Sequence, residues 1–273
     1  MILVQLTDLH IRPVGMAAYR TAETNMLSER AFRAVARMKV KPDAMVISGD
    51  LTDNGLPEEY TLLADMLRRY IQIPVYLIPG NHDRREVMKI EMGHFPGVAD
   101  APHFAHFVVD AHDVRLVMLD TVIPGSGAGE LCAERLAWLD ATLAADSSKP
   151  TIVVMHHPPF ATGIAHMDAI ALRNPDEFTA VIARHPQVKR ILCGHVHRPI
   201  NAPVAHAIAS ICPSVAHQVE FTIGDDPGAW NLEPAIFQVH ASVGSAIVSH
   251  SVYIEDFPGP FPFTLEADYP GAS

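Results

Sequence analysis

Short, almost purely apolar runs alternate with amphipathic stretches over the first two-thirds of this 273-residue chain. The runs are rich in Val, Ile and Leu and lack a polar face, which is typical of strands buried on both sides. They predict strands at 2–6, 43–48, 75–79, 107–120 (two strands around a turn), 151–155 and 189–194. Apolar residues at helical spacing predict helices at 23–38, 57–70, 133–145 and 176–185. Strands and helices in this order predict an α/β sandwich, in which helices cover the sheets.

Beyond about residue 200 the pattern changes to shorter β-like runs. These runs are "PVAHAIASI", "SVAHQVEFTI", "AIFQVHA" and "AIVSHSVYI". The final stretch, "FPGPFPFTLEADYPGAS", combines Pro with aromatic residues, so we expect it to lie extended on the surface or against a partner chain.

Composition excludes several classes of protein. The net charge of −11 counts against a protein that grips long nucleic acid, which needs Lys and Arg spread over one face. No apolar run is long enough to span a membrane, and "MILVQLTDLH" reads as a first strand and not as a signal peptide. Three cysteines at irregular spacing argue against a disulfide framework. We therefore expect a protein of the reducing cytoplasm, with no membrane partner.

Polar residues follow the C-terminal ends of five predicted strands. The segments are "TDLH", "SGD", "GNHD", "HHPP" and "GHVH". In open α/β sheets this edge is where ligands bind, so the five segments should meet at one site. The donors that they supply are Asp8, His10, Asp50, Asn81, His82, Asp83, His156, His195 and His197. In an extended segment the i, i+2 pairs Asp8/His10 and His195/His197 would project to the same side.

These residue types suit a metal centre. Carboxylates, imidazoles and an amide oxygen, without thiolate, favour divalent Mn, Fe, Co or Zn. Seven of these donors are candidate metal ligands: Asp8, His10, Asp50, Asn81, His156, His195 and His197. Seven ligands are too many for one tetrahedral ion but fit two ions that share a carboxylate. Asp50 is the best candidate for the shared ligand, because Gly49 allows a close backbone approach.

The five segments together resemble the calcineurin-like metallophosphoesterase superfamily. Its blocks D-x-H, G-D, G-N-H-D, H and G-H-x-H occur here in the same order. The resemblance implies a βαβ sandwich of two mixed sheets flanked by helices, with a catalytic core at 1–200. Residues 201–273 would supply the remaining core strands and a small C-terminal β cap or oligomerisation element.

The resemblance also implies roles for the individual residues. One metal would be held by Asp8, His10, Asp50 and His197, and the second by Asp50, Asn81, His156 and His195. A bridging hydroxide would complete the pair. His82 would bind substrate or donate a proton, and Asp83 would orient it.

Within the superfamily the chain most resembles bacterial class III cyclic-nucleotide and glycerophosphodiester phosphodiesterases. The similarity continues through "MHHPP", "MDAIAL" and "SVAHQV". It implies a homodimer or higher oligomer, and it makes His217 a candidate substrate contact. The expected substrate is a small phosphodiester, either a 3′,5′-cyclic nucleotide or a glycerophosphodiester.

The charge of the expected site agrees with that substrate. Two divalent ions, two carboxylates and one hydroxide leave a local excess of positive charge in an acidic protein, which suits a phosphodiester monoanion. The region after Asp50 reads "LTDNG" and lacks the arginine with which related phosphatases clamp a phosphate dianion, although Arg12, Arg84 or Arg85 could reach the site. A non-catalytic scaffold, a phosphomonoesterase and a nuclease of the same superfamily remain the alternatives.

Other polar residues are interpreted as structural. His157 would face away from His156 in an extended segment, which favours a supporting or surface position. Asp120 also follows a strand, and a capping or structural carboxylate is the simpler interpretation. The remaining histidines follow no ligand spacing and are treated as ordinary polar residues; they are His94, His103, His106, His112, His166, His185, His206, His240 and His250.

Overall fold

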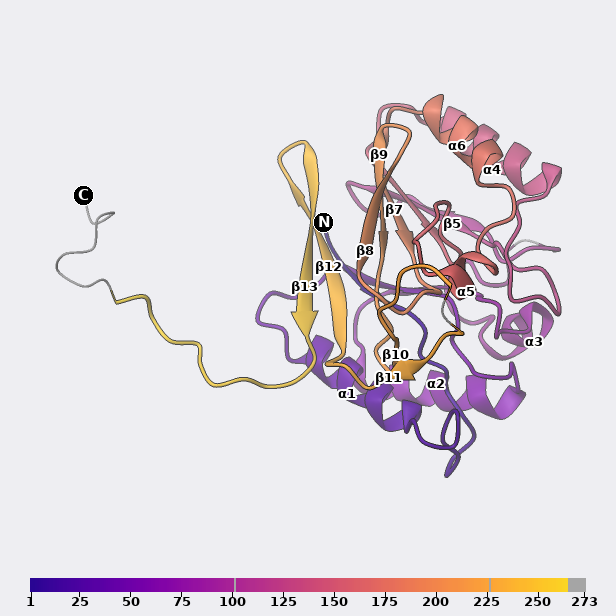
Figure 1. Ribbon diagram of the computed structural model, residues 1–273. Helices are drawn as coiled ribbons and strands as arrows, with labels where there is room; N and C mark the ends of the chain where they lie inside the picture. The colour runs from indigo at the N-terminus through magenta and orange to yellow at the C-terminus, as the bar shows by residue number, and fades with distance from the viewer. Residues whose placement is uncertain (101, 226, 265–273) are drawn as a thin grey trace.

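The computed structural model describes residues 1–100, 102–225 and 227–264, whose strands form two large sheets and one small one (Figure 1). The first sheet has the order β13-β12-β1-β2-β3. Its strands are β1 Ile2–Leu6, β2 Ala44–Ser48, β3 Val75–Ile78, β12 Ile236–Val243 and β13 Ala246–Tyr253. β1, β2 and β3 are parallel, whereas β12 is antiparallel to both of its neighbours.

The second sheet has the order β4-β5-β6-β7-β9-β8. Its strands are β4 Phe107–Val109, β5 Arg115–Leu119, β6 Thr151–Met155, β7 Val188–Cys193, β8 Ile200–Val204 and β9 Ala207–Ile211. The four inner strands are parallel, and the edge strands β4 and β8 are antiparallel. β10 Gln218–Val219 and β11 Trp230–Asn231 form the small sheet.

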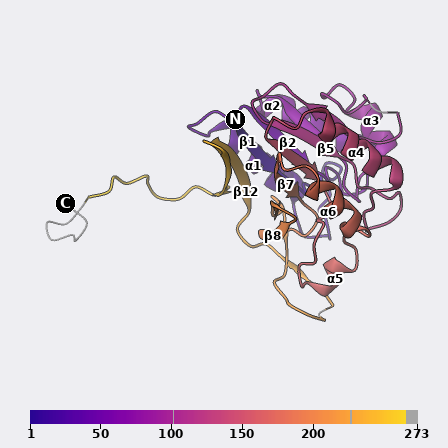
Figure 2. The same ribbon diagram turned by 90° about the horizontal axis from the view of Figure 1, so that it is seen from above.

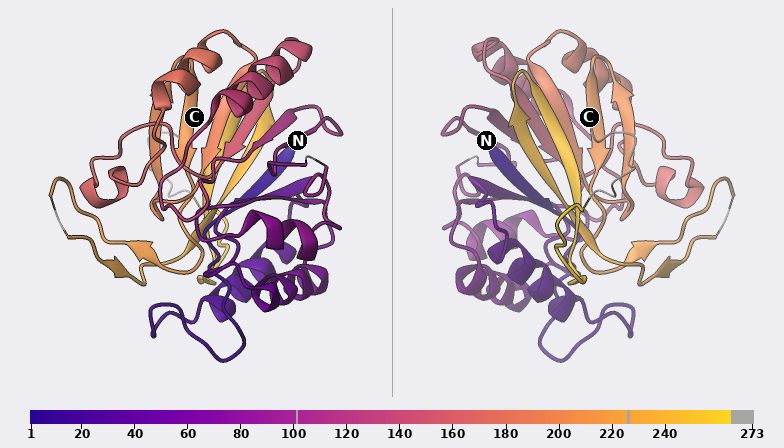
Figure 3. Two further views of the ribbon diagram at one scale, coloured as in Figure 1. Left: turned by 90° about the vertical axis from the view of Figure 1, so that its right-hand side faces the viewer. Right: turned by 90° about the vertical axis from the view of Figure 1, so that its left-hand side faces the viewer.

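Helices cover the outer face of each large sheet, as Figure 3 shows. α1 Thr24–Ala36, α2 Pro57–Tyr70 and α3 Arg85–Glu91 pack on the first sheet, and α4 Ala133–Ala145 and α6 Pro175–Ala183 pack on the second. α5 Ala165–Asp168 is a single turn. A third apolar cluster fills the space between the two sheets. The α/β fold of two mixed sheets flanked by helices is therefore confirmed, together with a small additional sheet.

The burial of the inner strands explains their apolar sequences. In β1, Val4 and Leu6 face the helices while Leu3 faces the other sheet. In β6, Val153 and Met155 face α4 and α6 while Ile152 and Val154 face the first sheet. Alternate side chains of one strand thus enter two different cores, so no position on the strand favours a polar residue.

The predicted helices, and the strands predicted before residue 200, agree with the structure to within about two residues. The run at 203–211 is divided between β8 and β9, and β11 was not expected. α3 and the single turn α5 were not expected. The run 214–223 was expected to be β-like, but only Gln218–Val219 is a strand. The hydroxyl of Ser214 accepts hydrogen bonds from the backbone N–H groups of Ala216 and His217, at 2.9 and 3.3 Å, and this turn prevents an extended conformation.

Strands from both sides of residue 200 share the two large sheets, so a division at that position stays a proposal. After β13 the chain runs away from the sheets in both Figure 1 and Figure 2. Phe257, Phe261 and Phe263 in this arm are exposed. Residues 265–273 of the Pro-rich tail lie outside the described residues. Within the described ranges, no helix combines the length and apolar character that a membrane crossing needs.

Candidate metal centre

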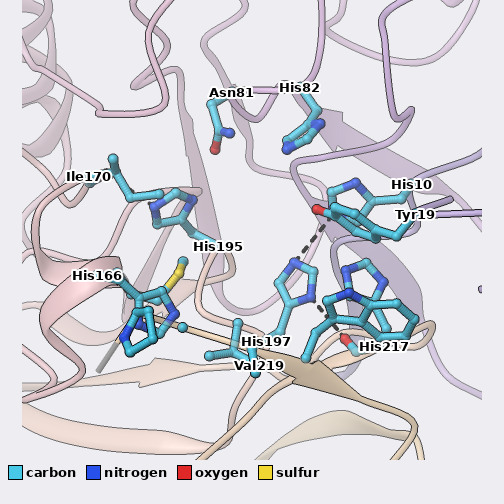
Figure 4. Close-up of a pocket in the computed structure, with 15 residues that line it drawn as sticks. His10, Tyr19, Asn81, His82, His166, Ile170, His195, His197, His217 and Val219 are labelled. Atoms are coloured by element: carbon cyan, nitrogen blue, oxygen red, sulfur yellow. Dashed lines mark hydrogen bonds between the residues drawn. The ribbon is translucent and has the colours of Figure 1, made fainter. Parts of the chain in front are cut away.

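The five polar segments converge at the carboxyl ends of β1, β2, β3, β6 and β7. Figure 4 shows the residues of three of them, His10, Asn81 with His82, and His195 with His197. Asp8, His10, Asp50 and His197 offer ligand atoms that lie within 4.8 Å of one another, and all four side chains are buried. His156, His157 and His195 form a second buried group by the same measure. The two groups meet at Asp50, whose Oδ2 lies 3.7 Å from Nε2 of His10 and 3.5 Å from Nε2 of His156.

Three of the imidazoles are held by one nitrogen and turn the other toward the cluster. Nδ1 of His10 donates to the Asp53 carboxylate (3.2 Å), and Nδ1 of His197 donates to the His217 carbonyl (2.8 Å). Nδ1 of His156 donates to the Ser48 carbonyl (2.8 Å). A neutral imidazole that donates from Nδ1 carries a lone pair on Nε2, so in the neutral form that binds metal each Nε2 is an acceptor.

These acceptors face other acceptors. Nε2 of His10 lies 3.2 Å from Nε2 of His197, and Nε2 of His197 lies 3.3 Å from Oδ1 of Asp8. Nε2 of His156 lies 3.1 Å from Oδ1 of Asn81. Buried lone pairs that point at one another repel unless a cation lies between them. The donor set of this chain therefore fits bound metal ions.

His195 and His157 differ from these three. Nε2 of His195 donates to the carbonyl of Ile170 at 3.1 Å, which leaves Nδ1 for the cluster. His157 has both nitrogens engaged, Nδ1 with Thr121 Oγ1 (2.8 Å) and Nε2 with the Gly127 carbonyl (3.1 Å). The alternative that His157 lies on the surface is wrong, because its side chain is fully buried beside His156 and His195.

Burial and mutual charge shift the ionisation of the cluster. Burial opposes ionisation of Asp50, but the neighbouring His156 and His82 imidazoles hold the pKa of its carboxyl well below the usual range. Burial likewise opposes protonation of His156, yet the Asp50 carboxylate raises the pKa of that imidazole to about 9. Burial and the adjacent His156 lower the pKa of His195 to about 3. Protons and metal ions would compete for the same lone pairs.

The expectation that the i, i+2 pairs project together from extended segments is wrong in its geometry. The φ angles are 53° at Asp8, 47° at His10, 74° at His195 and 54° at His197, all left-handed. Asp50 adopts φ 48° as well. A left-handed conformation at a non-glycine residue costs about 1–2 kcal/mol, and such strain concentrates at functional sites. The candidate ligands are brought together by strained turns that the surrounding contacts enforce.

Three motif glycines make room for ligands from other segments. A Cβ on Gly49 would lie 2.3 Å from Nδ1 of His156, and one on Gly80 would lie 2.2 Å from Oδ1 of Asp50. A Cβ on Gly194 would lie 2.8 Å from Oδ2 of Asp8. No larger residue fits at these positions without displacing a ligand, which explains why glycine precedes each of these polar segments.

Asp83 joins two of the ligand-bearing loops. Its carboxylate accepts hydrogen bonds from the backbone N–H groups of Leu51, Thr52 and Gly80, and from the hydroxyls of Thr52 and Tyr60, at 2.8–3.2 Å. Burial and the nearby Asp50 carboxylate raise the pKa of Asp83 to about 6. The Nδ1–H of His82 donates instead to the Asp53 carbonyl at 2.8 Å.

A pocket of about 260 Å³ opens above the cluster. It is lined by the predicted residues His10, Asn81, His82, His195, His197 and His217, and by Tyr19, Met167, Ile170 and Trp230, which the sequence did not single out. Tyr19 comes from the 11–20 loop, and Trp230 from the small sheet. Asp53 was also missed, although it holds the Nδ1 of His10 and, through its carbonyl, His82. Aromatic residues in loops of this kind give no periodic signal.

Two polar residues outside the cluster have structural positions. Asp120 forms a buried ion pair with Arg85 and accepts from the backbone N–H groups of Ala105 and Val122, which agrees with the structural interpretation of this carboxylate. His240, interpreted as an ordinary polar residue, is buried and contacts Oε1 of Gln5 at 3.1 Å and Oγ of Ser249 at 2.8 Å.

Known proteins with similar sequences or folds agree with this geometry. The family model described as calcineurin-like phosphoesterase matches residues 1–199. The probable glycerophosphodiester phosphodiesterase GpdQ of Arcobacter nitrofigilis is 34% identical over 269 residues, which cover 97% of this chain and 98% of that protein. A probable cyclic nucleotide phosphodiesterase of Rhodopseudomonas palustris is 37% identical over 258 residues, 90% of each chain. A dimetal phosphatase from Danio rerio has a similar fold, with a TM-score of 0.68 at 14% identity over 94% of this chain and 97% of that one.

Proposed function

The chain belongs to the calcineurin-like phosphoesterase family, and we propose that it is a metal-dependent phosphodiesterase that hydrolyses small phosphodiesters. The observation that supports this most directly is the position of Asp50, whose Oδ2 lies between His10 and His156 and within 3.7 Å of both. A carboxylate in that position can be shared by two cations.

The proposed ligand sets follow from the two halves of the cluster. Asp8, His10, Asp50 and His197 would hold one divalent ion; Asp50, Asn81, His156 and His195 would hold the other. Their nitrogen and oxygen donors suit Mn, Fe, Co or Zn. When bound, such ions activate water and neutralise charge on phosphoryl oxygens.

His82 and His217 are proposed to contact the substrate. The backbone N–H of His82 donates to Oδ1 of Asp50 (2.8 Å), and its Nδ1 donates to the Asp53 carbonyl, so the imidazole is fixed with Nε2 free. Burial opposes protonation of His82, but the Asp50 carboxylate raises the pKa of its imidazole. In the protonated form Nε2 carries a hydrogen, and because His82 lines the pocket it can then donate a hydrogen bond to a phosphoryl oxygen or a proton to the leaving alcohol. His217 is buried beside His10 and His197, and its Nδ1 has no hydrogen-bond partner among the described residues. Asp83 is proposed to fix the loops on either side of His82.

The pocket favours diesters over monoesters. In the described part of the chain no arginine lines it: Arg12 is paired with Asp53 at 3.0 Å, and Arg85 is paired with Asp120. A phosphate dianion would lack the guanidinium partner that such charge favours, whereas a diester monoanion needs less neutralisation. The net charge of −11 also argues against a nuclease for long polymers.

Self-association is proposed from the C-terminal arm. Phe257, Phe261 and Phe263 are 63%, 78% and 102% exposed and follow edge strand β13 in the chain. Three exposed aromatic residues close together on one extended arm are expected to be covered in solution, and a second copy of this chain is the proposed partner. The three cysteines are free, which supports a reducing, cytoplasmic location.

The proposal is tested with metal-loaded protein and matched substrates. Bis(p-nitrophenyl) phosphate, p-nitrophenyl phosphate, cyclic AMP and glycerophosphoethanolamine are compared with and without EDTA. We expect chelator-sensitive turnover of diesters that exceeds turnover of the monoester. Faster monoester hydrolysis would overturn the substrate class, and a loaded protein without turnover would support a non-catalytic scaffold.

A single substitution tests the second ligand set. Asn81→Ala should lower both the metal content and kcat/KM, because it removes the amide oxygen that faces His156 at 3.1 Å. Asn201→Ala, at an exposed position on edge strand β8, is the matched control and should change neither. Full metal content and activity in Asn81→Ala would contradict the second ligand set.

A further inference from the structure

One wall of the pocket is built from aromatic rings that begin at the metal ligands. His217 packs against His10 with ring centroids 5.1 Å apart. Tyr19 and Trp230 then pack against His217, at 5.1 and 5.6 Å, each inclined 74° to its ring. Tyr19 and Trp230 lie 5.5 Å apart and are tilted only 33° from each other, so they form one panel beside His217.

The opposite side of the pocket is formed mainly by aliphatic residues. Met167 and Ile170 line it together with His166, and Figure 4 shows Ile170 and His166 across the pocket from Tyr19 and His217. None of the lining side chains in the described part of the chain is Lys, Arg, Asp or Glu. A slot between an aromatic panel and an aliphatic wall suits a flat, uncharged group.

Hydrogen bonds fix both walls relative to the metal ligands. The segment that carries His217 holds Nδ1 of His197 through its carbonyl, and Val219 pairs directly with Trp230 in the small sheet. On the other side, the Ile170 carbonyl holds Nε2 of His195. A group that fills the slot is therefore positioned relative to the reacting phosphate.

Tyr19 is held in an unusual backbone conformation. Its φ is 48°, the φ of Arg20 is 62°, and the Ala18 and Ala22 backbones pair on either side at 2.8–2.9 Å. Two consecutive left-handed residues are unfavourable without a compensating gain. In this turn they place the Tyr19 ring against Trp230 and His217.

We propose that Trp230, supported by Tyr19, is the specificity-determining residue of this site and selects phosphodiesters with a planar ring, such as a nucleobase, over diesters of glycerol. The inference rests on the proposed function. A quaternary ammonium group is best held by several Trp, Tyr or Phe rings, and the described lining offers only Tyr19 and Trp230, packed against each other on one side.

The test compares three substrates of the metal-loaded enzyme: cyclic AMP, the 3′,5′-cyclic phosphate of methyl riboside, which lacks the base, and glycerophosphoethanolamine. Stacking on an aromatic ring contributes about 1–3 kcal/mol per base, so Trp230→Leu should raise KM for cyclic AMP about 5–150-fold. KM for the other two substrates should stay within about twofold, and Trp230→Phe should retain most of the affinity for cyclic AMP.

Phe221→Leu is the matched control. Phe221 lies in the connection between β10 and β11, at whose far end Trp230 lies; it is 63% exposed and does not line the pocket. It should leave all three substrates unchanged. An equal loss of all three substrates in Trp230→Leu would overturn the inference, as would wild-type protein that hydrolyses the base-free cyclic phosphate as efficiently as cyclic AMP. A loss confined to glycerophosphocholine, assayed in parallel, would identify a cation site instead.

A binding measurement separates this inference from the proposed function. The chain has two tryptophans, so Trp138→Phe leaves Trp230 as the only tryptophan fluorophore. Adenosine 5′-monophosphate should quench Trp230 emission in a saturable way, and glycerol 3-phosphate should not. Absence of quenching would contradict the inference that the Tyr19–Trp230 panel binds a planar ring. Absence of diester turnover alone would refute only the proposed function.

Discussion

Gly80→Ala should disable the metal centre through one contact. Gly80 has no left-handed φ, so the substitution adds no backbone strain of that kind. The new Cβ would lie 2.2 Å from Oδ1 of Asp50 and 2.3 Å from its backbone N, where ordinary contacts begin at 3.4 Å. Asp50 or the Gly80 turn must therefore move by about 1 Å, and because the backbone N takes part, a side-chain rotation cannot relieve the overlap.

The magnitude follows from the role proposed for Asp50. A displacement of about 1 Å at a reacting centre can cost about 10²-fold in rate, and overpacking of a tight contact costs about 1–3 kcal/mol of stability. We expect kcat/KM for bis(p-nitrophenyl) phosphate to fall at least about 100-fold. Metal content, measured by inductively coupled plasma mass spectrometry, should fall below that of the wild type.

Gly127→Ala is the matched control for this prediction. Its Cβ would meet only the Ile170 side chain, at 3.5–3.8 Å, and its φ is also not left-handed. It should retain metal and activity. Gly80→Ala protein with wild-type metal content and wild-type kcat/KM would refute the reasoning, since the predicted overlap would then have no consequence at Asp50.

Three further substitutions test supporting contacts. Burial lowers the pKa of His240 from 6.5 to about 3, so the unfolded chain binds this proton more readily and folding loses stability as pH falls from 6.5 toward 3. At pH 5 the loss is about 2 kcal/mol, and denaturant unfolding of His240→Gln at pH 7 and 5 should show a correspondingly smaller difference. Asp83→Asn should destabilise the fold in the same unfolding assay and reduce metal content, because the Nδ2 group cannot accept the hydrogen bonds that Leu51, Thr52 or Gly80 donate to the carboxylate oxygen it replaces. Removal of a buried charge whose pKa is raised to about 6 offsets part of that loss. Arg85→Ala should destabilise the fold by about 3–5 kcal/mol, since it leaves the Asp120 carboxylate buried without its ion-pair partner. The folded protein should keep its metal, and an unchanged melting temperature would contradict the prediction.

The fold and the convergence of the candidate ligands were largely predictable because both depend on short-range pattern. Apolar runs such as 151–155 are buried on both faces in any parallel arrangement, and residues that follow them, such as His156, meet at one sheet edge. That argument needs only strand positions and the chemistry of the side chains. The candidate ligands could therefore be named without knowing the conformation of any turn.

The conformation of those turns was not predictable in the same way. Asp8 and His10 were expected in an extended segment, but both are left-handed and are held by backbone bonds to Gly49 and Asp50. Such conformations depend on contacts between loops far apart in the chain. Tyr19 and Trp230 were missed for a related reason, because their proximity arises from tertiary packing that no local pattern encodes.

The buried histidines show the limit of spacing arguments. His157 and His240 follow no ligand pattern, yet both are buried and hydrogen-bonded. A histidine next to a ligand in sequence is equally compatible with solvent exposure and with burial, and only the partners Thr121 and Gly127 distinguish the two for His157. Sequence spacing identifies residues that share a face, but it does not identify the buried residues that pack against them or hydrogen-bond to them from outside the cluster.

The central claim is that Asp50 is shared by two cations. Anomalous diffraction from crystals of Mn-loaded protein, recorded on both sides of the metal absorption edge, tests it directly. We predict two anomalous peaks per chain, one among Asp8, His10 and His197 and one among Asn81, His156 and His195, with Asp50 touching both. A single peak, or two peaks of which only one contacts Asp50, would contradict the account.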